Sequence, residues 1–185
     1  MNKTQSSMKN KKLRLLVTKE CHNNCPKCCN KLYDLDSIPV IDRFDYDEVC
    51  ITGGEPMLDF KYVLNVASMF KTIALCQDRT IKVYIYTANM SNAQFLALSK
   101  VVDGFVYTPH SDADVGTFIY LNNSMLRNTL FRIRAAQLSL RLNLFADVKE
   151  QLHGEDLSLW KIKDMEWLDD CPVPEGEDFR RVTFI

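Results

Sequence analysis

Stretches with the periodicity of strands alternate along this chain with stretches that have the periodicity of helices. Residues 81–87 put Ile81, Val83 and Ile85 on one side and polar or aromatic residues on the other, which is typical of a strand with two different faces. Residues 59–76 repeat apolar side chains at helical spacing, which indicates one buried stripe on a helix. Because parallel strands need a long crossover between them, the alternation predicts strand–helix units on a parallel sheet.

The expected elements set the size of that sheet. A closed barrel of eight units usually needs about 250 residues, so a chain of 185 residues fits five or six units. We therefore predict a single α/β domain, 13–185, with parallel strands in a partial, TIM-like barrel. Residues 1–12 are predicted to be a basic flexible tail, and residues 147–180, which have no clear period, a lid or a trailing segment. Strands are expected at 13–18, 49–52, 81–87, 104–108, 138–145 and 181–185, and helices at 59–76, from 91 to about 102, at 121–137 and briefly within 30–36.

Composition argues against several classes of protein. The net charge is −1, with 46% hydrophobic and 25% charged residues, which gives no overall attraction to nucleic acid or to anionic membranes. No stretch approaches the roughly 20 apolar residues of a membrane span, and the polar first residues do not resemble a secretory signal. Seven cysteines without such a signal argue against a disulfide framework and for a reducing compartment. We therefore expect a cytoplasmic protein.

Three cysteines lie on the segment that follows the first predicted strand. Cys21, Cys25 and Cys28 have three and then two residues between them, so their thiols can converge on one inorganic centre. A [4Fe–4S] cluster normally takes four thiolates, and no fourth ligand is nearby, so one iron would remain open to another molecule. Structural zinc sites usually have four ligands, often from two Cys-x2-Cys pairs. Only one such pair is present here, and zinc remains the alternative metal.

The second predicted strand is followed by a Gly-Gly-Glu-Pro turn, formed by Gly53, Gly54, Glu55 and Pro56. Glycine and proline often do no more than end a strand. Glu55, however, has glycine beside it, so backbone and carboxylate can both accept hydrogen bonds from an ammonium group without steric obstruction. Charge-assisted hydrogen bonds of this kind are strong.

Together, the Cys-x3-Cys-x2-Cys loop and the Gly-Gly-Glu-Pro turn resemble the radical S-adenosylmethionine (SAM) superfamily over about residues 13–148. The resemblance implies a [4Fe–4S] cluster on Cys21, Cys25 and Cys28, whose open iron is chelated by the amino and carboxylate groups of SAM, with residues 53–56 around the amino group. It also implies the chemistry. A one-electron donor such as flavodoxin or ferredoxin reduces the cluster, SAM is cleaved to a 5′-deoxyadenosyl radical, and this radical abstracts hydrogen from a substrate.

Further SAM contacts are expected at strand ends. The leucines of 138–145 should face the helices, which leaves Arg141 and Asn143 on the other face. A guanidinium suits the SAM carboxylate, so Arg141 is its candidate partner, and Asn143 is a candidate for the ribose. Thr87 and Asn89 end the third strand, where the family commonly contacts ribose and carboxylate. Many members have an aromatic residue before the third cysteine, where this chain has Lys27, so no adenine contact is carried over.

Three other reactive side chains receive separate hypotheses. His110 follows the fourth predicted strand, at the end of the sheet where barrel active sites lie, and is a candidate catalytic residue as a substrate contact or proton donor. Cys29 is expected to be structural, because it would point away from a cluster held by its neighbour. Cys171 is either a redox partner for a radical or a lone surface thiol.

The sequence leaves the substrate open among three classes. One is a small molecule, as for the 7-carboxy-7-deazaguanine synthases of modified-nucleobase synthesis. Another is a glycine of a partner protein on which the enzyme installs a radical, as for the activating enzymes of anaerobic ribonucleotide reductases, whose loops resemble residues 25–30, Cys-Pro-Lys-Cys-Cys-Asn. The third is no substrate at all, in a non-enzymatic iron–sulfur or zinc module, which residues 53–56 argue against.

Overall fold

Seven parallel strands form the single sheet of this protein in the computed structural model, which describes residues 11–170 and 172–183. The order across the sheet is β6-β5-β4-β3-β2-β1-β7, so β6 and β7 are its two edges and the sheet is not closed. This open α/β sheet is consistent with the predicted partial barrel, with more strands than expected. The strands are β1 (Lys12–Leu16), β2 (Glu48–Thr52), β3 (Lys82–Thr87), β4 (Gly104–Tyr107), β5 (Ser139–Leu144), β6 (Lys161–Asp164) and β7 (Glu177–Arg181).

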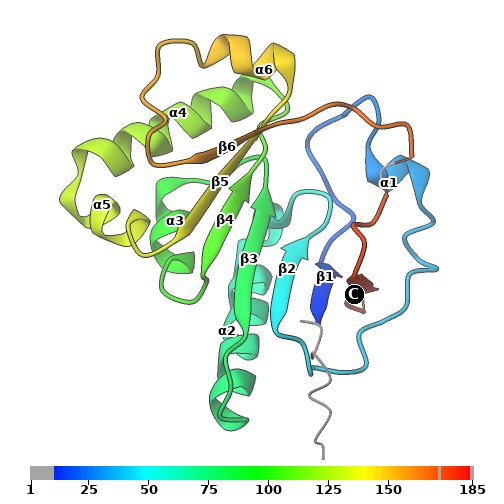
Figure 1. Cartoon of the computed structure of the whole chain (residues 1–185). Coiled ribbons are helices and arrows are strands. Elements are labelled where there is room, and N and C mark those ends of the chain that lie inside the picture. Colours follow the sequence, from blue (N-terminus) through cyan, green and yellow to red (C-terminus); the bar gives the residue numbers. More distant parts are fainter. Residues whose placement is uncertain (1–10, 171, 184–185) are drawn as a thin grey trace, which may run out of the picture.

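The main helices lie along one side of the sheet (Figure 1) and enclose the hydrophobic core against it. Phe70 of α2, Phe95 of α3 and Phe118 of α4 are completely buried there. The helices are α1 (Cys29–Leu32), α2 (Phe60–Cys76), α3 (Asn92–Leu98), α4 (Asp112–Arg127), α5 (Thr129–Ala135) and α6 (Ala146–Gln151), with a 3-10 turn, η1, at Pro56–Asp59.

The helix predicted at 121–137 is wrong in its bounds. α4 begins at Asp112, because Ser111 caps it by accepting a hydrogen bond from the Asp114 backbone N–H at 3.3 Å. Asn128 then separates α4 from α5, since its extended backbone ends the first helix and its side chain accepts from the Leu130 N–H at 2.9 Å. Ser, Asn and Asp favour such caps over helix interiors.

Strand β5 has the two faces that the sequence predicts. Leu140, Leu142 and Leu144 belong to the core between sheet and helices, whereas Arg141 and Asn143 are half-buried on the opposite face. This second face carries the polar side chains of the sheet and positions the candidate site.

The segment expected to be a lid or a trailing piece contributes regular structure. Residues 147–180 contain most of α6, all of β6 and most of β7. All four residues of β6 are exposed, so the strand has no apolar period by which it could be detected. The last strand ends at Arg181 instead of beginning there. Residues 1–10 of the predicted tail and Cys171 lie outside the described residues.

The loops that leave the carboxyl ends of the strands gather at one end of the sheet. In Figure 1 the chain that follows β6 crosses over this end toward α1 before it descends into β7. The cysteine loop leaves β1, and the Gly-Gly-Glu-Pro turn leaves β2, at the same end. A ligand in this position is typical of parallel α/β folds.

Candidate functional site

A cavity of about 850 Å³ lies on the polar face of the sheet and receives side chains from all seven strands. Its volume is in the upper part of the range for small-molecule sites. Pro56, buried at the start of η1, and Asn89 are the only predicted site residues that do not line it. The other ten do: Cys21, Cys25, Cys28, Gly53, Gly54, Glu55, Thr87, His110, Arg141 and Asn143.

The three loop cysteines are free thiols and are half-buried. Burial raises the pKa of Cys21, and burial together with the neighbouring thiols raises the pKa of Cys25 to about 11. A thiol with a raised pKa is protonated at neutral pH and is a poor nucleophile. Thiols of this kind lose their protons when they bind a metal.

The cysteine loop is not a preformed metal site. In the part of the chain that the structure describes, no three His, Cys, Asp or Glu side chains are close enough together to hold a metal ion. Cys29, predicted from the sequence to be structural, is disulfide-bonded, although the composition argues for a reducing compartment. Cys29 is therefore not a fourth free thiol on this loop.

Gly53 and Gly54 are required by close backbone contact with the segment that leads into the cysteine loop. The N–H of Gly54 donates to the Thr18 carbonyl at 2.8 Å, and the N–H of Glu55 donates to the Glu20 carbonyl at 2.7 Å. A Cβ on Gly53 would lie 2.6 Å from the Thr18 carbonyl oxygen, and one on Gly54 would overlap the Glu20 backbone. The turn and the cysteine loop are thus built as one unit.

The Glu55 carboxylate has partners within the protein. It is 1% exposed and accepts hydrogen bonds from the Thr87 hydroxyl at 2.6 Å, the Ala88 N–H at 2.8 Å and the Met57 N–H at 3.0 Å. Burial raises the pKa of Glu55, and these hydrogen bonds oppose that rise. Glu55 and Thr87 therefore tie the end of β2 to the end of β3.

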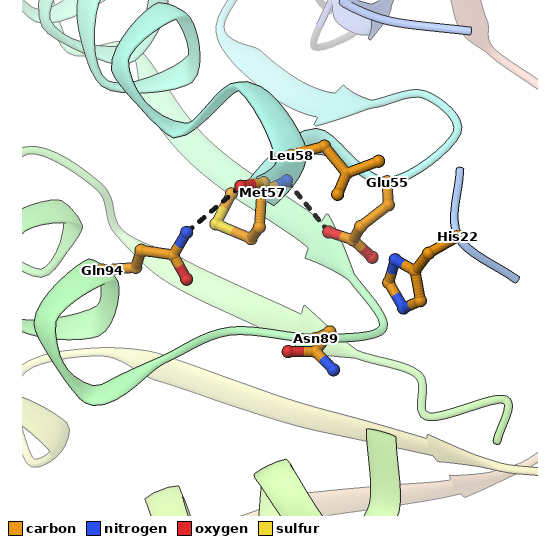
Figure 2. A pocket seen from close by; sticks show the side chains of 6 residues that line it. All are labelled: His22, Glu55, Met57, Leu58, Asn89 and Gln94. Atoms are coloured by element: carbon orange, nitrogen blue, oxygen red, sulfur yellow. Dashed lines mark hydrogen bonds between the residues drawn. The ribbon is translucent and has the colours of Figure 1, made fainter. Parts of the chain in front are cut away.

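Asn89 lies in a second, smaller cavity of about 240 Å³ (Figure 2), which His22 and Glu55 also line. Its side-chain amide donates to Asp114 at 3.0 Å. Gln94 borders the same cavity and donates to the Met57 carbonyl at 3.1 Å. Asn89 thus does not line the large cavity, although its backbone N–H donates to the Thr87 hydroxyl at 3.1 Å. The Asn89 side chain is held by Asp114, a residue that the sequence did not single out.

Asp114 joins three of the loops at this end of the sheet. Its side chain is fully buried and accepts from His22 Nε2 at 3.0 Å, Asn23 Nδ2 at 2.8 Å and the His110 N–H at 3.1 Å, besides Asn89. Burial alone would raise the pKa of Asp114, but the hydrogen bonds outweigh it and lower the pKa. Two of the residues between the first two cysteines are therefore fixed by one carboxylate.

A sequence signal for Asp114 exists in the Ser111-x-x-Asp114 spacing, which is typical of a helix N-terminus. This spacing predicts that α4 begins next to Ser111, whereas the apolar period alone predicts a start at residue 121. It does not predict the partners of the carboxylate, because His22 is 92 positions away in the chain.

His110 lies in a group of aromatic rings at one end of the large cavity. Its ring is 5.5 Å from the rings of Phe145 and Trp167, which stack on each other at 3.9 Å between centroids. Burial lowers the pKa of His110, so the neutral ring is favoured. Its Nδ1 is buried and has no hydrogen-bond partner among the described residues. Sequence reasoning missed both aromatic partners.

Arg141 and Arg14 stack on two tyrosines of β3 from opposite sides of the cavity. The Arg141 guanidinium lies 5.1 Å from the Tyr84 ring centre, and that of Arg14 lies 4.9 Å from the Tyr86 ring centre. Arg14 also pairs with Glu177 at 2.7 Å. Within the described residues Arg141 has no carboxylate partner, so it is the guanidinium available to an anionic ligand. Two residues further along β5, Asn143 Nδ2 donates to the Thr108 hydroxyl at 3.2 Å.

No protein-family model matches this chain, and no curated protein matches it. Among the described residues no helix is long and apolar enough to cross a membrane.

Proposed function

We propose that this chain is a radical SAM enzyme that holds a [4Fe–4S] cluster on Cys21, Cys25 and Cys28. The observation that carries the proposal is that the two sequence motifs, the cysteine loop and the Gly-Gly-Glu-Pro turn, lie together in the structure. The cysteine loop and the turn at 53–55 line one cavity and are joined by the hydrogen bonds of the Gly54 and Glu55 N–H groups.

The donor set suits the cluster. Thiolates are the usual ligands of iron–sulfur clusters, and the loop offers three free thiols while Cys29 is disulfide-bonded. Because the three are not gathered beforehand, the loop must close as they lose their protons, which couples cluster binding to local ordering. When bound, the cluster and SAM supply the reductive cleavage of SAM to methionine and a 5′-deoxyadenosyl radical, with the electron from an external donor such as flavodoxin or ferredoxin.

The surrounding residues would bind and orient SAM. Arg141, without a carboxylate partner among the described residues, is assigned to the SAM carboxylate, and Asn143 to the ribose. The Glu55 carboxylate already accepts three protein hydrogen bonds, so the amino group is assigned to the backbone of the turn. Asn89, engaged by Asp114, supports the loop instead of contacting the ribose.

The shape of the cavity favours a small-molecule substrate over a glycine of a partner protein. The segment that joins β6 to β7 lines the cavity with residues 165–168 and 172–174. In Figure 1 this segment runs over the carboxyl ends of the strands. A segment in this position helps to exclude water from a reactive intermediate. It would also obstruct the entry of a folded protein's loop.

The test is anaerobic reconstitution with iron and sulfide, followed by reduction with dithionite in the presence of SAM. We expect about four irons and four sulfides per chain, since three cysteines hold one [4Fe–4S] cluster, and formation of 5′-deoxyadenosine measured by liquid chromatography. Zinc in the purified protein, or an intact cluster that yields no 5′-deoxyadenosine with any substrate tried, would contradict the proposal. Cys76→Ala, at the exposed end of α2, is the matched control and should behave as wild type.

A further inference from the structure

We infer that the β6 side of the cavity binds the phosphate of a nucleotide, and that a nucleotide is the substrate. As a statement about the substrate it rests on the proposed function, whereas the binding site itself does not. The inference comes from two neighbouring groups of residues, the unpaired cations of β5 and β6 and the rings that follow these strands.

Three cations line the same wall of the cavity. They are Arg141 on β5 and Lys161 and Lys163 on β6. Arg141 lies directly opposite Lys161 in the parallel register, and Asn143 lies opposite Lys163. Within the described residues, none of the three cations pairs with a carboxylate, although Glu166 lines the same cavity. Like charges side by side on neighbouring strands repel each other, so this arrangement is unfavourable until an anion binds.

On the opposite wall of the cavity, in contrast, the cations are paired with carboxylates. There Arg14 is neutralised by Glu177 on the neighbouring edge strand, and Lys27 pairs with Asp169 at 2.6 Å. On the β5–β6 wall, Asp164 of β6 pairs with Lys149 instead, and among the described residues Glu166 pairs with none of the three cations. The cations there are therefore available to a ligand.

The amount of unpaired charge indicates which anion. The single carboxylate of SAM, assigned to Arg141, neutralises one cation and leaves Lys161 and Lys163. A phosphate monoester carries a charge of about −1.5 to −2 at neutral pH, and lysine is a common phosphate ligand because its ammonium acts as a point charge. A phosphate therefore matches the two lysines better than a second carboxylate does.

The rings supply the other half of the argument. Phe145 directly follows β5, Trp167 lies three residues after the end of β6, and the two rings stack on each other at an interplanar angle of 9°. Beside them, His110 Nδ1 is buried without a partner among the described residues, and a buried polar atom of this kind calls for a ligand or a water. A planar heterocycle with ring nitrogen or carbonyl groups satisfies the aromatic surface and the imidazole together. A nucleotide carries both of these groups, a heterocycle and a phosphate, on one molecule.

The binding test uses the full chain and needs no turnover. The probes are AMP, GMP, CMP and UMP, the four corresponding nucleosides, and inorganic phosphate, titrated by calorimetry with saturating SAM present. We expect at least one monophosphate to bind about tenfold or more tightly than its nucleoside, since two charge-assisted contacts are lost with the phosphate. Raising the salt concentration should lower the affinity for the monophosphate and leave the affinity for the nucleoside unchanged.

Substitutions locate the site. The double variant Lys161→Ala, Lys163→Ala should bind the monophosphate about tenfold or more weakly than the wild type does. Lys149→Ala is the matched control, because Lys149 pairs with Asp164 of the same strand at 2.8 Å and does not line the cavity. Trp167 fluorescence should change on binding, and Trp167→Phe should abolish that change. Trp160, which is 6% exposed, should be silent.

The outcomes are distinct. Equal affinity for nucleoside and monophosphate, an unchanged affinity in the double lysine variant, or displacement of the monophosphate by SAM would each overturn the inference. If SAM cleavage is observed and no monophosphate binds, the inference fails while the proposed function stands. If a monophosphate binds and SAM is never cleaved, the nucleotide site stands and the radical chemistry fails.

Discussion

The two halves of the candidate site are built in opposite ways. On the side of β1, β2 and β3, the polar groups have partners within the protein: Glu55 accepts three hydrogen bonds, and Asp114 joins three loops. On the side of β5 and β6, Arg141 and His110 Nδ1 are without such partners among the described residues. The positions of Glu55 and Asp114 are therefore fixed by hydrogen bonds within the fold, whereas Arg141 and His110 Nδ1 are available to a ligand.

The largest effect expected on the first half is the loss of the proposed cluster. Cys21→Ala removes one of three thiolates and should abolish the brown colour and the reduced-state electron paramagnetic resonance signal of reconstituted protein. Cys50→Ala is the control, because Cys50 is buried within β2 and does not line the cavity. Retention of a full cluster in Cys21→Ala would mean that the ligands are not those of the loop.

Substitution of a turn glycine should have the next largest effect. Gly54→Ala forces a Cβ into the Glu20 backbone and should lower the free energy of unfolding by about 3 kcal/mol. Gly116→Ala is the matched control, since a Cβ there meets nothing within 4 Å and the residue lies within helix α4. It should raise stability by about 0.5–1 kcal/mol. Urea denaturation measures both, and equal effects would show that the turn is not tightly held.

Asp114→Asn tests the carboxylate that joins the loops. We expect a loss of about 2 kcal/mol at neutral pH, because hydrogen bonds to a charged acceptor are weakened. Asp112→Asn, exposed in the same helical turn, should change stability by less than about 1 kcal/mol. An equal loss from both variants would argue that only the helix dipole is involved.

The stability difference between the wild type and Asp114→Asn should depend on pH. The pKa of Asp114 is lowered below its ordinary value of 3.8 on folding, so the ionised carboxylate stabilises the fold above the unfolded pKa. This contribution is lost as the pH falls through the folded pKa. The stability difference between wild type and Asp114→Asn should therefore shrink in acid. A difference that grows on acidification would mean that folding does not lower this pKa.

The smallest effect on stability is expected in the second half. Arg141→Met removes a side chain without a carboxylate partner among the described residues and should change the free energy of unfolding by no more than about 1 kcal/mol. Its affinity for SAM should nevertheless fall about tenfold, through the lost pairing with the carboxylate. Arg14→Met, stacked in the same way but paired with Glu177, should cost about 1–2 kcal/mol. The reverse order of stabilities would contradict the contrast between the two halves.

The parts of this structure that follow a regular period could be predicted from the sequence. Alternation in 138–145 assigned Arg141 and Asn143 to the correct face, and the rule that parallel strands end at one edge brought the cysteines, the glycine turn and His110 together. Helix α2 was predicted almost to the residue, because its apolar stripe is continuous.

The parts that depend on non-local contacts or on exposed residues could not be predicted. β6 has no buried residue, so neither the strand nor its cavity lysines left a pattern. The role of Glu55 as a tie between β2 and β3 depends on Thr87 and Ala88, which are 32 and 33 positions away. The group formed by Phe145, Trp167 and His110 likewise arises only when the strands stand side by side.

The pairing of β1 with β7 has a consequence for synthesis of the protein. The strand that leads into the three thiols completes its hydrogen bonding with a strand whose Glu177 is 163 positions from Arg14. During translation, β1 therefore keeps one unpaired edge, next to oxidisable thiols, until β7 has left the ribosome. Such late closure slows folding and leaves an aggregation-prone edge in the meantime, so the proposed iron–sulfur cluster should be loaded best after β7 has paired with β1.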